Sequence, residues 1–346
     1  NEQMQASDKF FIMGHANEDY YAIGSAIGMA KLSLSLNKET YIVVSGRNEN
    51  VNRISEMLAS ESMKVTGHEE DYNSIMVEEE EALKHITPDS LLVLVDHHRE
   101  ILTASKAVLE AISKRIIVDH HRRAEDLIGD TVLLYLEPSS SSTSELLTEL
   151  VGYFNDRLEI TPAEATALYS GIVLDTKNFA VQTGERTFEA AALLRRSGAD
   201  PNIVRLMFKD DMDVLKLRAR LIAEAKTIEP GIAIALYKRA EKGAKATILA
   251  AQVADTLINI EGFHVGVAIN EYKDGSLGVS ARSDGSVNVQ IIMEELGGGG
   301  HQTVAGVQLD NMRAADIEPQ IIALAKKQLE QLEEKDNNES DSVTRC

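Results

Sequence analysis

Short apolar runs alternate with helical patterns from residue 10 to about residue 197. The runs have the length and composition of buried strands, and they lie at 10–13, 41–44, 91–95, 116–118 and 132–136. Apolar positions recur with helical spacing at about 23–36, 50–58, 105–111, 142–154 and 162–175. Strands that alternate with helices form a mostly parallel sheet with helices on both faces. We therefore predict an α/β domain over residues 1–200.

A connector and a second domain follow in the sequence. Residues 202–228 have the apolar spacing of one helix, which Pro230-Gly231 ends, so we expect a helical linker over 201–230. Strand-like runs at 232–237, 265–270 and 277–281, with helical patterns at 288–295 and 314–332, predict a smaller α/β domain over 231–333. Residues 334–346 are polar, and we expect a disordered acidic tail there.

Charge and cysteine content narrow the function classes. The 346 residues carry 35 basic and 55 acidic side chains, a formal net charge of −20, so we expect no binding of long nucleic acid. Plain solubility is the alternative explanation of this charge. The single cysteine, Cys346, excludes disulfide frameworks and thiolate zinc sites, which fits the cytoplasm. No apolar run reaches the roughly 20 residues of a membrane span, so we expect no membrane contact here. The start at Asn1 indicates an excised fragment.

Carboxylates and imidazoles gather where apolar runs end. His15 and Asp19 follow the run at 10–13, Asp96 follows 91–95, and Asp119-His120-His121 begins after 116–118. Asp175 follows 171–174, which we take as a fourth short strand although 162–175 also has helical spacing. Ligands of open α/β sheets bind beyond the carboxyl ends of the strands. These ligand types suit Mn²⁺, and two such ions can activate water against a phosphodiester. For a single residue such as His15, a buried or capping role is the alternative.

Further segments have the composition of phosphate contacts. Gly297, Gly298, Gly299 and Gly300 precede His301 and predict a flexible loop whose N–H groups surround a phosphate, although a simple turn is the alternative. Arg186 and the pair Arg282-Ser283 are further candidates, with ordinary surface arginines as the alternative. Ser139–Ser142 followed by Glu145 is typical of a helix cap. The small residues Gly24–Gly28 indicate a close backbone approach.

Taken in order, these motifs resemble those of a known family. Gly-His-x-x-x-Asp at 14–19, Val-Asp at 95–96, Asp-His-His at 119–121, Leu-Asp at 174–175 and Gly-Gly-Gly-Gly-His at 297–301 resemble the DHH/DHHA1 phosphoesterases. The resemblance covers residues 9–333 and is most specific for the cytosolic part of membrane-anchored cyclic-di-AMP phosphodiesterases of the GdpP type. It implies Mn²⁺-dependent hydrolysis of cyclic-di-AMP to pApA. It also implies transmembrane, PAS and degenerate GGDEF segments upstream, and we expect a homodimer.

The resemblance also implies residue roles. One ion would be held by His15, Asp19 and Asp96, and the other by Asp96, His120 and Asp175, with Asp96 bridging. Asp119 would orient an imidazole, so that Asp96, Asp119, His120 and His121 form the catalytic set. The phosphates would face His121, Arg186, Arg282, Ser283, Gly297, Gly298, Gly299, Gly300 and His301.

Three positions depart from the family pattern. Tyr21 stands where the family has a second Asp, Glu18 stands in place of Pro, and His97 stands where Thr is usual. A phenol with a pKa of about 10 is a poor Mn²⁺ ligand. The departures leave open a weakened enzyme, a site rebuilt with His97 or Glu18, and a module that binds the nucleotide without turnover. Short oligonucleotides or 3′-phosphoadenosine phosphate are alternative substrates.

Overall fold

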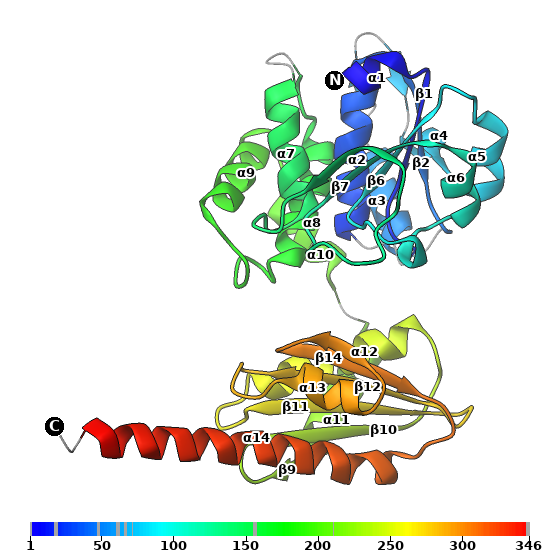
Figure 1. Cartoon of the computed structure of the whole chain (residues 1–346). Helices are drawn as coiled ribbons and strands as arrows, with labels where there is room; N and C mark the ends of the chain where they lie inside the picture. Colours follow the sequence, from blue (N-terminus) through cyan, green and yellow to red (C-terminus); the bar gives the residue numbers. More distant parts are fainter. Residues whose placement is uncertain are drawn as a thin grey trace. The chain divides into compact units, whose positions relative to one another are not determined.

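The chain forms two units in a computed structural model, Asn1–Lys209 and Asp210–Cys346 (Figure 1). The structure describes residues 2–16, 20–46, 49–59, 63–65, 68–70, 72–154, 158–209 and 211–343. Within these ranges, no helix is both long enough and apolar enough to cross a bilayer. The predicted fold class, a mostly parallel α/β domain followed by a smaller α/β domain, is confirmed.

A six-stranded parallel sheet is the centre of the first unit. Its strand order is β5-β2-β1-β6-β7-β8. Every residue of Leu91–Val95 in β6 is buried, as expected for a strand whose two faces are both covered. The strands are β1 (Lys9–Met13), β2 (Glu39–Val43), β5 (Met76–Val77), β6 (Leu91–Val95), β7 (Lys114–Asp119) and β8 (Thr131–Leu136). A separate hairpin pairs β3 (Met63–Val65) with β4 (His68–Glu70).

Helices cover both faces of this sheet. Alternate strand residues point to opposite layers: Phe10 and Ile12 pack with α2, α3, α7 and α8, whereas Phe11 and Met13 pack with α5 and α6. The helices of the unit are α1 (Glu2–Ala6), α2 (Tyr20–Ser35), α3 (Glu49–Ala59), α4 (Tyr72–Ile75), α5 (Glu79–His85), α6 (Lys106–Ala111), α7 (Thr143–Phe154), α8 (Pro162–Asp175), α9 (Glu185–Arg196) and α10 (Pro201–Met207), with a 3₁₀ turn at Glu100–Leu102.

Helices α2 and α8 pack at unusually short range. A Cβ atom at Gly24 would lie 2.5 Å from the Ala167 carbonyl oxygen, and one at Gly28 would lie 2.8 Å from the Leu168 side chain. A buried ion pair joins the same helices, since Lys31 Nζ lies 3.0 Å from Glu164 Oε2. The close approach predicted from the small residues at 24–28 is thus present. It fixes α8 against the helix that begins just after the first motif.

The second unit has a mixed sheet of order β13-β14-β12-β11-β10-β9. Helices α13 and α14 cover one face, and α11 and α12 cover part of the other (Figure 1). The strands are β9 (Lys226–Ile228), β10 (Ile232–Ala240), β11 (Val265–Tyr272), β12 (Leu277–Ser283), β13 (Gly299–His301) and β14 (Val304–Leu309). The helices are α11 (Met212–Ala223), α12 (Ala244–Ile258), α13 (Val289–Glu295) and α14 (Ala314–Val343).

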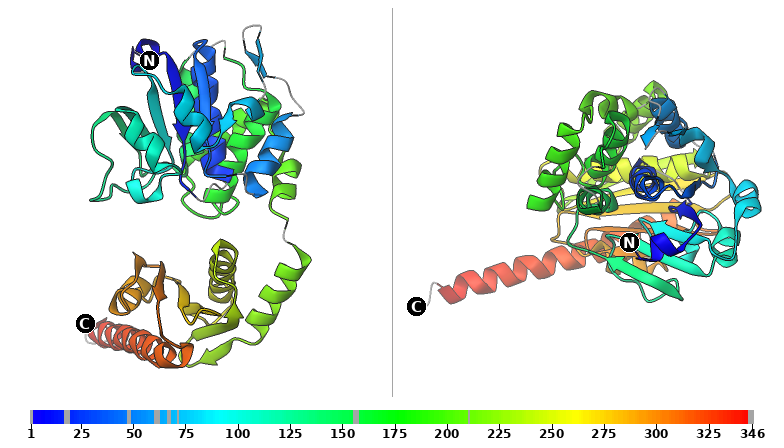
Figure 2. Two further views of the ribbon diagram at one scale, coloured as in Figure 1. Left: turned by 90° about the vertical axis from the view of Figure 1, so that its right-hand side faces the viewer. Right: turned by 90° about the horizontal axis from the view of Figure 1, so that it is seen from above.

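Two expectations about chain segments are corrected. The stretch 201–230 is not one helix, because α10 ends at Met207 and a new helix, α11, begins after Asp211. The Asp211 carboxylate accepts a hydrogen bond from the Asp213 N–H, a capping interaction that starts a helix rather than continuing one. The residues from 334 onward were expected to be disordered, but α14 continues to Val343 and projects beyond the sheet (Figure 2). A helix already formed extends at little cost.

Candidate metal centre

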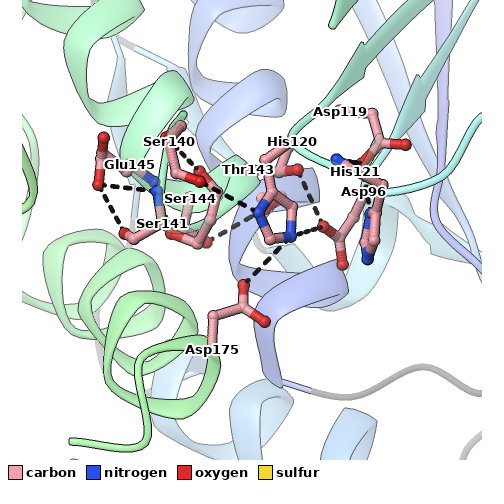
Figure 3. Close-up of polar contacts among 12 residues, drawn as sticks. Asp96, Asp119, His120, His121, Ser140, Ser141, Thr143, Ser144, Glu145 and Asp175 are labelled. Atoms are coloured by element: carbon pink, nitrogen blue, oxygen red, sulfur yellow. Dashed lines mark hydrogen bonds and ion pairs between the residues drawn. The ribbon is translucent and has the colours of Figure 1, made fainter. Parts of the chain in front are cut away.

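The carboxyl ends of three adjacent parallel strands meet at one edge of the first sheet. His15 follows β1, Asp96 follows β6, and Asp119 ends β7 with His120 directly after it. Asp175 reaches the same place from the last turn of α8 (Figure 3). The expectation that Asp175 ends a strand is therefore wrong, because Gly171–Leu174 is the apolar end of a helix. That helix starts with a complete capping box at Thr161 and Glu164.

Asp96 is the central side chain of this edge. Its Oδ2 atom lies 3.9 Å from His15 Nε2, and its Oδ1 atom lies 3.7 Å from His120 Nε2. Its backbone has a φ of 66°, a left-handed conformation that is uncommon for residues with a side chain. Such strain is kept where the surroundings over-determine it, often at functional sites. The carboxylate thus presents a different oxygen to each imidazole.

His120 turns one ring nitrogen toward two carboxylates. Its Nε2 atom lies 3.8 Å from Asp175 Oδ2 and 3.7 Å from Asp96 Oδ1, while Nδ1 faces the Ser140 carbonyl at 3.4 Å. Burial, together with the neighbouring His121, lowers the pKa of His120 to about 4. The ring is therefore neutral at pH 7, with the proton on Nδ1 and a lone pair on Nε2. Within the described ranges, no hydrogen-bond donor or acceptor meets that buried Nε2 atom.

Asp119 lies behind the site and holds two imidazoles. Its Oδ2 accepts a hydrogen bond from His98 Nδ1 at 2.5 Å, and its Oδ1 accepts one from His121 Nδ1 at 2.7 Å. Burial acts to raise the pKa of Asp119, but the bonds from His121 and His98 outweigh it and hold the pKa well below its usual range. Asp119 therefore remains a carboxylate and acts as an acceptor for histidine N–H groups.

His97 occupies the departure position after Asp96. His97 is 2 % exposed, and its Nδ1 atom faces the Arg99 carbonyl at 3.3 Å. Burial lowers the pKa of His97 to about 4, which keeps the ring neutral. Its Nε2 atom has no hydrogen-bond partner within the part of the chain that is described.

The donor set fits a divalent metal. Asp96, Asp119, His120 and His121 can each offer an atom within 4.8 Å of the others. Both oxygens of Asp119 already accept hydrogen bonds from histidine N–H groups. We therefore regard Asp119 and His121 as residues that lie behind the metal site and do not bind the ion. His120 Nε2 faces Asp96 and Asp175, and His15 Nε2 faces the other oxygen of Asp96, so these four side chains could hold a metal ion. Imidazole and carboxylate ligands together suit Mn²⁺ or a similar ion.

Three positions of the first motif cannot be placed. Asp19 and Glu18 lie outside the described residues. Tyr21 belongs to α2, but its side chain lies outside the description as well.

Arg186, a predicted phosphate contact, makes a two-pronged ion pair with Glu149, at 2.8 Å and 2.6 Å. That pair raises the pKa of Arg186 above its ordinary value.

The predicted phosphate contacts of the second unit lie close together on its sheet. Arg282 Nε donates to Asp255 Oδ1 at 2.9 Å, and the Ser283 hydroxyl donates to the Val287 carbonyl at 2.6 Å. The glycine run is not the flexible loop expected, because Gly299–His301 forms strand β13 beside β14. Glycine is required there by close packing: a Cβ atom at Gly298 would lie 2.3 Å from the Gly306 carbonyl oxygen. His301 at the end of β13 is exposed.

Sequence reasoning missed three contributors to the site. His98 donates to Asp119, Thr143 Oγ1 donates to Asp96 Oδ1 at 2.9 Å, and Ser140 contributes its carbonyl group to His120. A signal for His98 was present, because Asp96-His97-His98 repeats the tripeptide of residues 119–121. For Thr143, the hydroxyl-rich stretch that starts at Ser139 was noted only as a helix cap.

Comparisons with known proteins agree with this geometry. The model of the DHH family, N-terminal domain, matches residues 9–172, and that of the DHHA1 domain matches residues 232–331. Cyclic-di-AMP phosphodiesterase PdeA of Listeria monocytogenes is 39% identical over 325 residues, 93% of this chain and 48% of that protein. Cyclic-di-AMP phosphodiesterase GdpP of Geobacillus thermodenitrificans is 42% identical over 320 residues, covering 92% and 47%. The chain thus spans about half the length of these curated relatives.

A solved structure shows the same fold. An exopolyphosphatase-related protein from Bacteroides fragilis superposes with a TM-score of 0.78 at 20% identity, covering 94% of each chain.

Proposed function

Because the chain belongs to the DHH/DHHA1 phosphoesterases, with a DHH domain followed by a DHHA1 domain, we propose that it hydrolyses cyclic-di-AMP to pApA with Mn²⁺. The observation that carries the proposal is Asp96, whose two oxygens face two different imidazoles, His15 at 3.9 Å and His120 at 3.7 Å. A carboxylate presented in this way is suited to bridge two cations. The relatives named as cyclic-di-AMP phosphodiesterases support the choice of substrate.

The side chains of this site have separate tasks in the proposed reaction. A bound pair of divalent cations supplies Lewis acidity and lowers the pKa of water. Asp96 would contribute to both metal positions, His15 and Asp19 would hold one ion, and His120 with Asp175 would hold the other. The attacking water would release one proton to solvent as its oxygen forms a bond to phosphorus, and the bond from phosphorus to the 3′ oxygen would break. His121, whose side chain is 54% exposed, donates the proton that the 3′ oxygen requires.

We assign phosphate binding to Arg186 in the first unit and to Arg282, Ser283 and Gly297–His301 in the second. His301 is exposed and lies at the end of an edge strand, beside the glycines. We expect His301→Ala to weaken binding of the dinucleotide and to leave Mn²⁺ stoichiometry unchanged. Calorimetry that finds a lost metal site in this variant would contradict the assignment.

The decisive experiment is product analysis. The purified chain is incubated with Mn²⁺ and cyclic-di-AMP, and the products are separated by ion-exchange chromatography, with a chelated sample as the control. Parallel samples with short oligonucleotides and 3′-phosphoadenosine phosphate test the other substrates. Formation of pApA supports the proposal. Bound nucleotide without product over many hours would instead identify a binding module.

Tyr21 determines how strongly the second ion is held. If its phenol replaces a lost carboxylate, the native chain binds one ion well and the other weakly, and Tyr21→Asp raises second-site occupancy. The hydrolysis rate should then rise by roughly 5- to 150-fold, equivalent to about 1–3 kcal/mol. Full two-ion occupancy in the native chain would show that another group, such as His97 or Glu18, already supplies the ligand.

A further inference from the structure

The segment at the start of α7 contacts two of the side chains that face the second metal position, Asp96 and His120. Thr143, the first residue of α7, donates its hydroxyl proton to Asp96 Oδ1 at 2.9 Å. The Ser140 carbonyl faces His120 Nδ1 at 3.4 Å. Thr143 is 0% exposed and Asp96 is 1% exposed, so water does not compete for this bond. One short stretch of chain thus holds the carboxylate and the imidazole in place (Figure 3).

The bond to Asp96 distinguishes its two oxygens. Oδ1, the oxygen that accepts from Thr143, faces His120, whereas Oδ2 faces His15. Rotation of a carboxylate about its last bond is soft, so an Asp side chain does not by itself keep one oxygen for each neighbour. The position of Thr143 Oγ1 is itself restricted, because a β-branched side chain in a helix has few rotamers. It can therefore fix the plane of the carboxylate.

We propose that Thr143 is a positioning residue that sets the Asp96 carboxylate across the two metal positions, with Oδ1 directed to the position beside His120 and Asp175. The inference rests on the proposed metal site but not on the identity of the substrate. Groups that orient metal ligands commonly change metal affinity by about 10- to 100-fold when removed. By the family resemblance, the ion beside His120 is also the one that loses a carboxylate ligand through the change to Tyr21. The orientation of Asp96 Oδ1 should therefore affect affinity for this ion more strongly than it would in a site with a full set of ligands.

The test replaces the hydroxyl and reads metal binding directly. Thr143→Val keeps the shape and removes the donor, whereas Thr143→Ser keeps the donor. We expect Thr143→Val to weaken binding of the second Mn²⁺ by about 10- to 100-fold in calorimetry. The magnetic coupling between paired Mn²⁺ ions should be lost from its electron paramagnetic resonance spectrum. Thr143→Ser should retain both. If Thr143→Val does not fold, Thr143→Ala takes its place.

A matched control lies five residues further along the same helix. Thr148 is also 0% exposed, and its hydroxyl donates to the Ser144 carbonyl at 2.7 Å instead of to a ligand. Thr148→Val should bind both ions as the native chain does, with a comparable melting temperature in chelator. Native-like metal binding in Thr143→Val, failure of Thr143→Ser to rescue, or an equal loss in Thr148→Val would each overturn the proposal. A native chain that binds no Mn²⁺ would overturn the metal site itself, which is a different result.

Discussion

Asp96-His97-His98 and Asp119-His120-His121 are the same tripeptide at the ends of the adjacent parallel strands β6 and β7, and the structure uses them differently. In the first, the carboxylate faces the site, between His15 and His120. In the second, the imidazole of His120 faces the site, and the carboxylate of Asp119 lies behind it. The third residues, His98 and His121, both donate to Asp119.

The backbone accounts for this difference. Strand β7 includes Asp119, whereas β6 ends one residue earlier, at Val95. Asp96 leaves the strand in a left-handed conformation with a φ of 66°, which redirects its side chain. Identical residues thus face the proposed metal site in one place and bind two imidazoles behind it in the other. The chemistry of a motif depends on where the strand stops as well as on which residues follow it.

The largest difference between the two tripeptides should appear at their aspartates. Asp96→Asn removes the charge that spans both metal positions, and we expect the hydrolysis rate to fall by about 1000-fold or more, equivalent to about 4 kcal/mol. Steady-state rates at saturating Mn²⁺ measure the effect. Asp126→Asn, which changes an exposed ion pair with Arg99, is the matched control. A variant that keeps more than a tenth of the native rate would remove the bridging role.

Asp119→Asn should have a smaller effect, because it alters the support of the histidines and no ligand. We expect Mn²⁺ affinity to fall in both Asp119→Asn and His98→Gln by no more than the about 10- to 100-fold typical of groups that orient a ligand, because His98 and His121 are not among the proposed ligands. Titration with Mn²⁺ at pH 7 measures both variants. Complete loss of metal binding in Asp119→Asn, equal to that of Asp96→Asn, would mean that Asp119 is itself a ligand and that the two carboxylates are equivalent.

The second residues of the tripeptides should share a pH effect. The pKa of His97 and that of His120 are both lowered to about 4, mainly by burial, against about 6.5 in the unfolded chain. Between these values the unfolded state binds more protons, so stability falls as the pH falls from about 6.5 to about 4. The free energy of unfolding of the metal-free native chain should fall between pH 7 and pH 5. In metal-free His97→Gln this fall should be smaller by about 2 kcal/mol.

Urea unfolding in chelator at the two pH values measures this difference. His85→Gln, on the partly exposed end of α5, serves as the control and should follow the native chain. Parallel losses in the native chain and in His97→Gln would show that His97 does not titrate as its burial requires.

Most of the first fold could be predicted from the sequence, because strands covered on both faces are continuous apolar runs. Leu91–Val95 is such a run, and its bounds were predicted correctly. A run of only four apolar residues does not determine the secondary structure. Gly171–Leu174 fits a strand or the end of a buried helix equally well, and for that reason Asp175 was wrongly placed at the end of a strand. Helix α12 was missed, since its alanine-rich sequence gives weak contrast between its faces.

The gathering of the site's side chains was predictable, and their orientation was not. Parallel strands bring their carboxyl ends to one edge, so His15, Asp96 and His120 could be expected to meet. Which of two carboxylates faces the site depends on the φ angle of Asp96, and no pattern in the sequence encodes that value. Thr143 and Ser140 were missed because they act on ligands of strands that lie far away in the chain.

The contact between α2 and α8 gives the site a dependence on residues that never approach a ligand. Gly24 lies against Ala167, and Asp175 follows eight residues later, about 12 Å along the helix axis. A side chain at Gly24 would push α8 away from α2. Because a helix moves as a rigid body, the Asp175 carboxylate at its end would be displaced as well. Screens for loss-of-function alleles should therefore recover changes at Gly24 or Gly28 as folded proteins with poor metal occupancy. A survey of ligand positions alone would classify such alleles as silent.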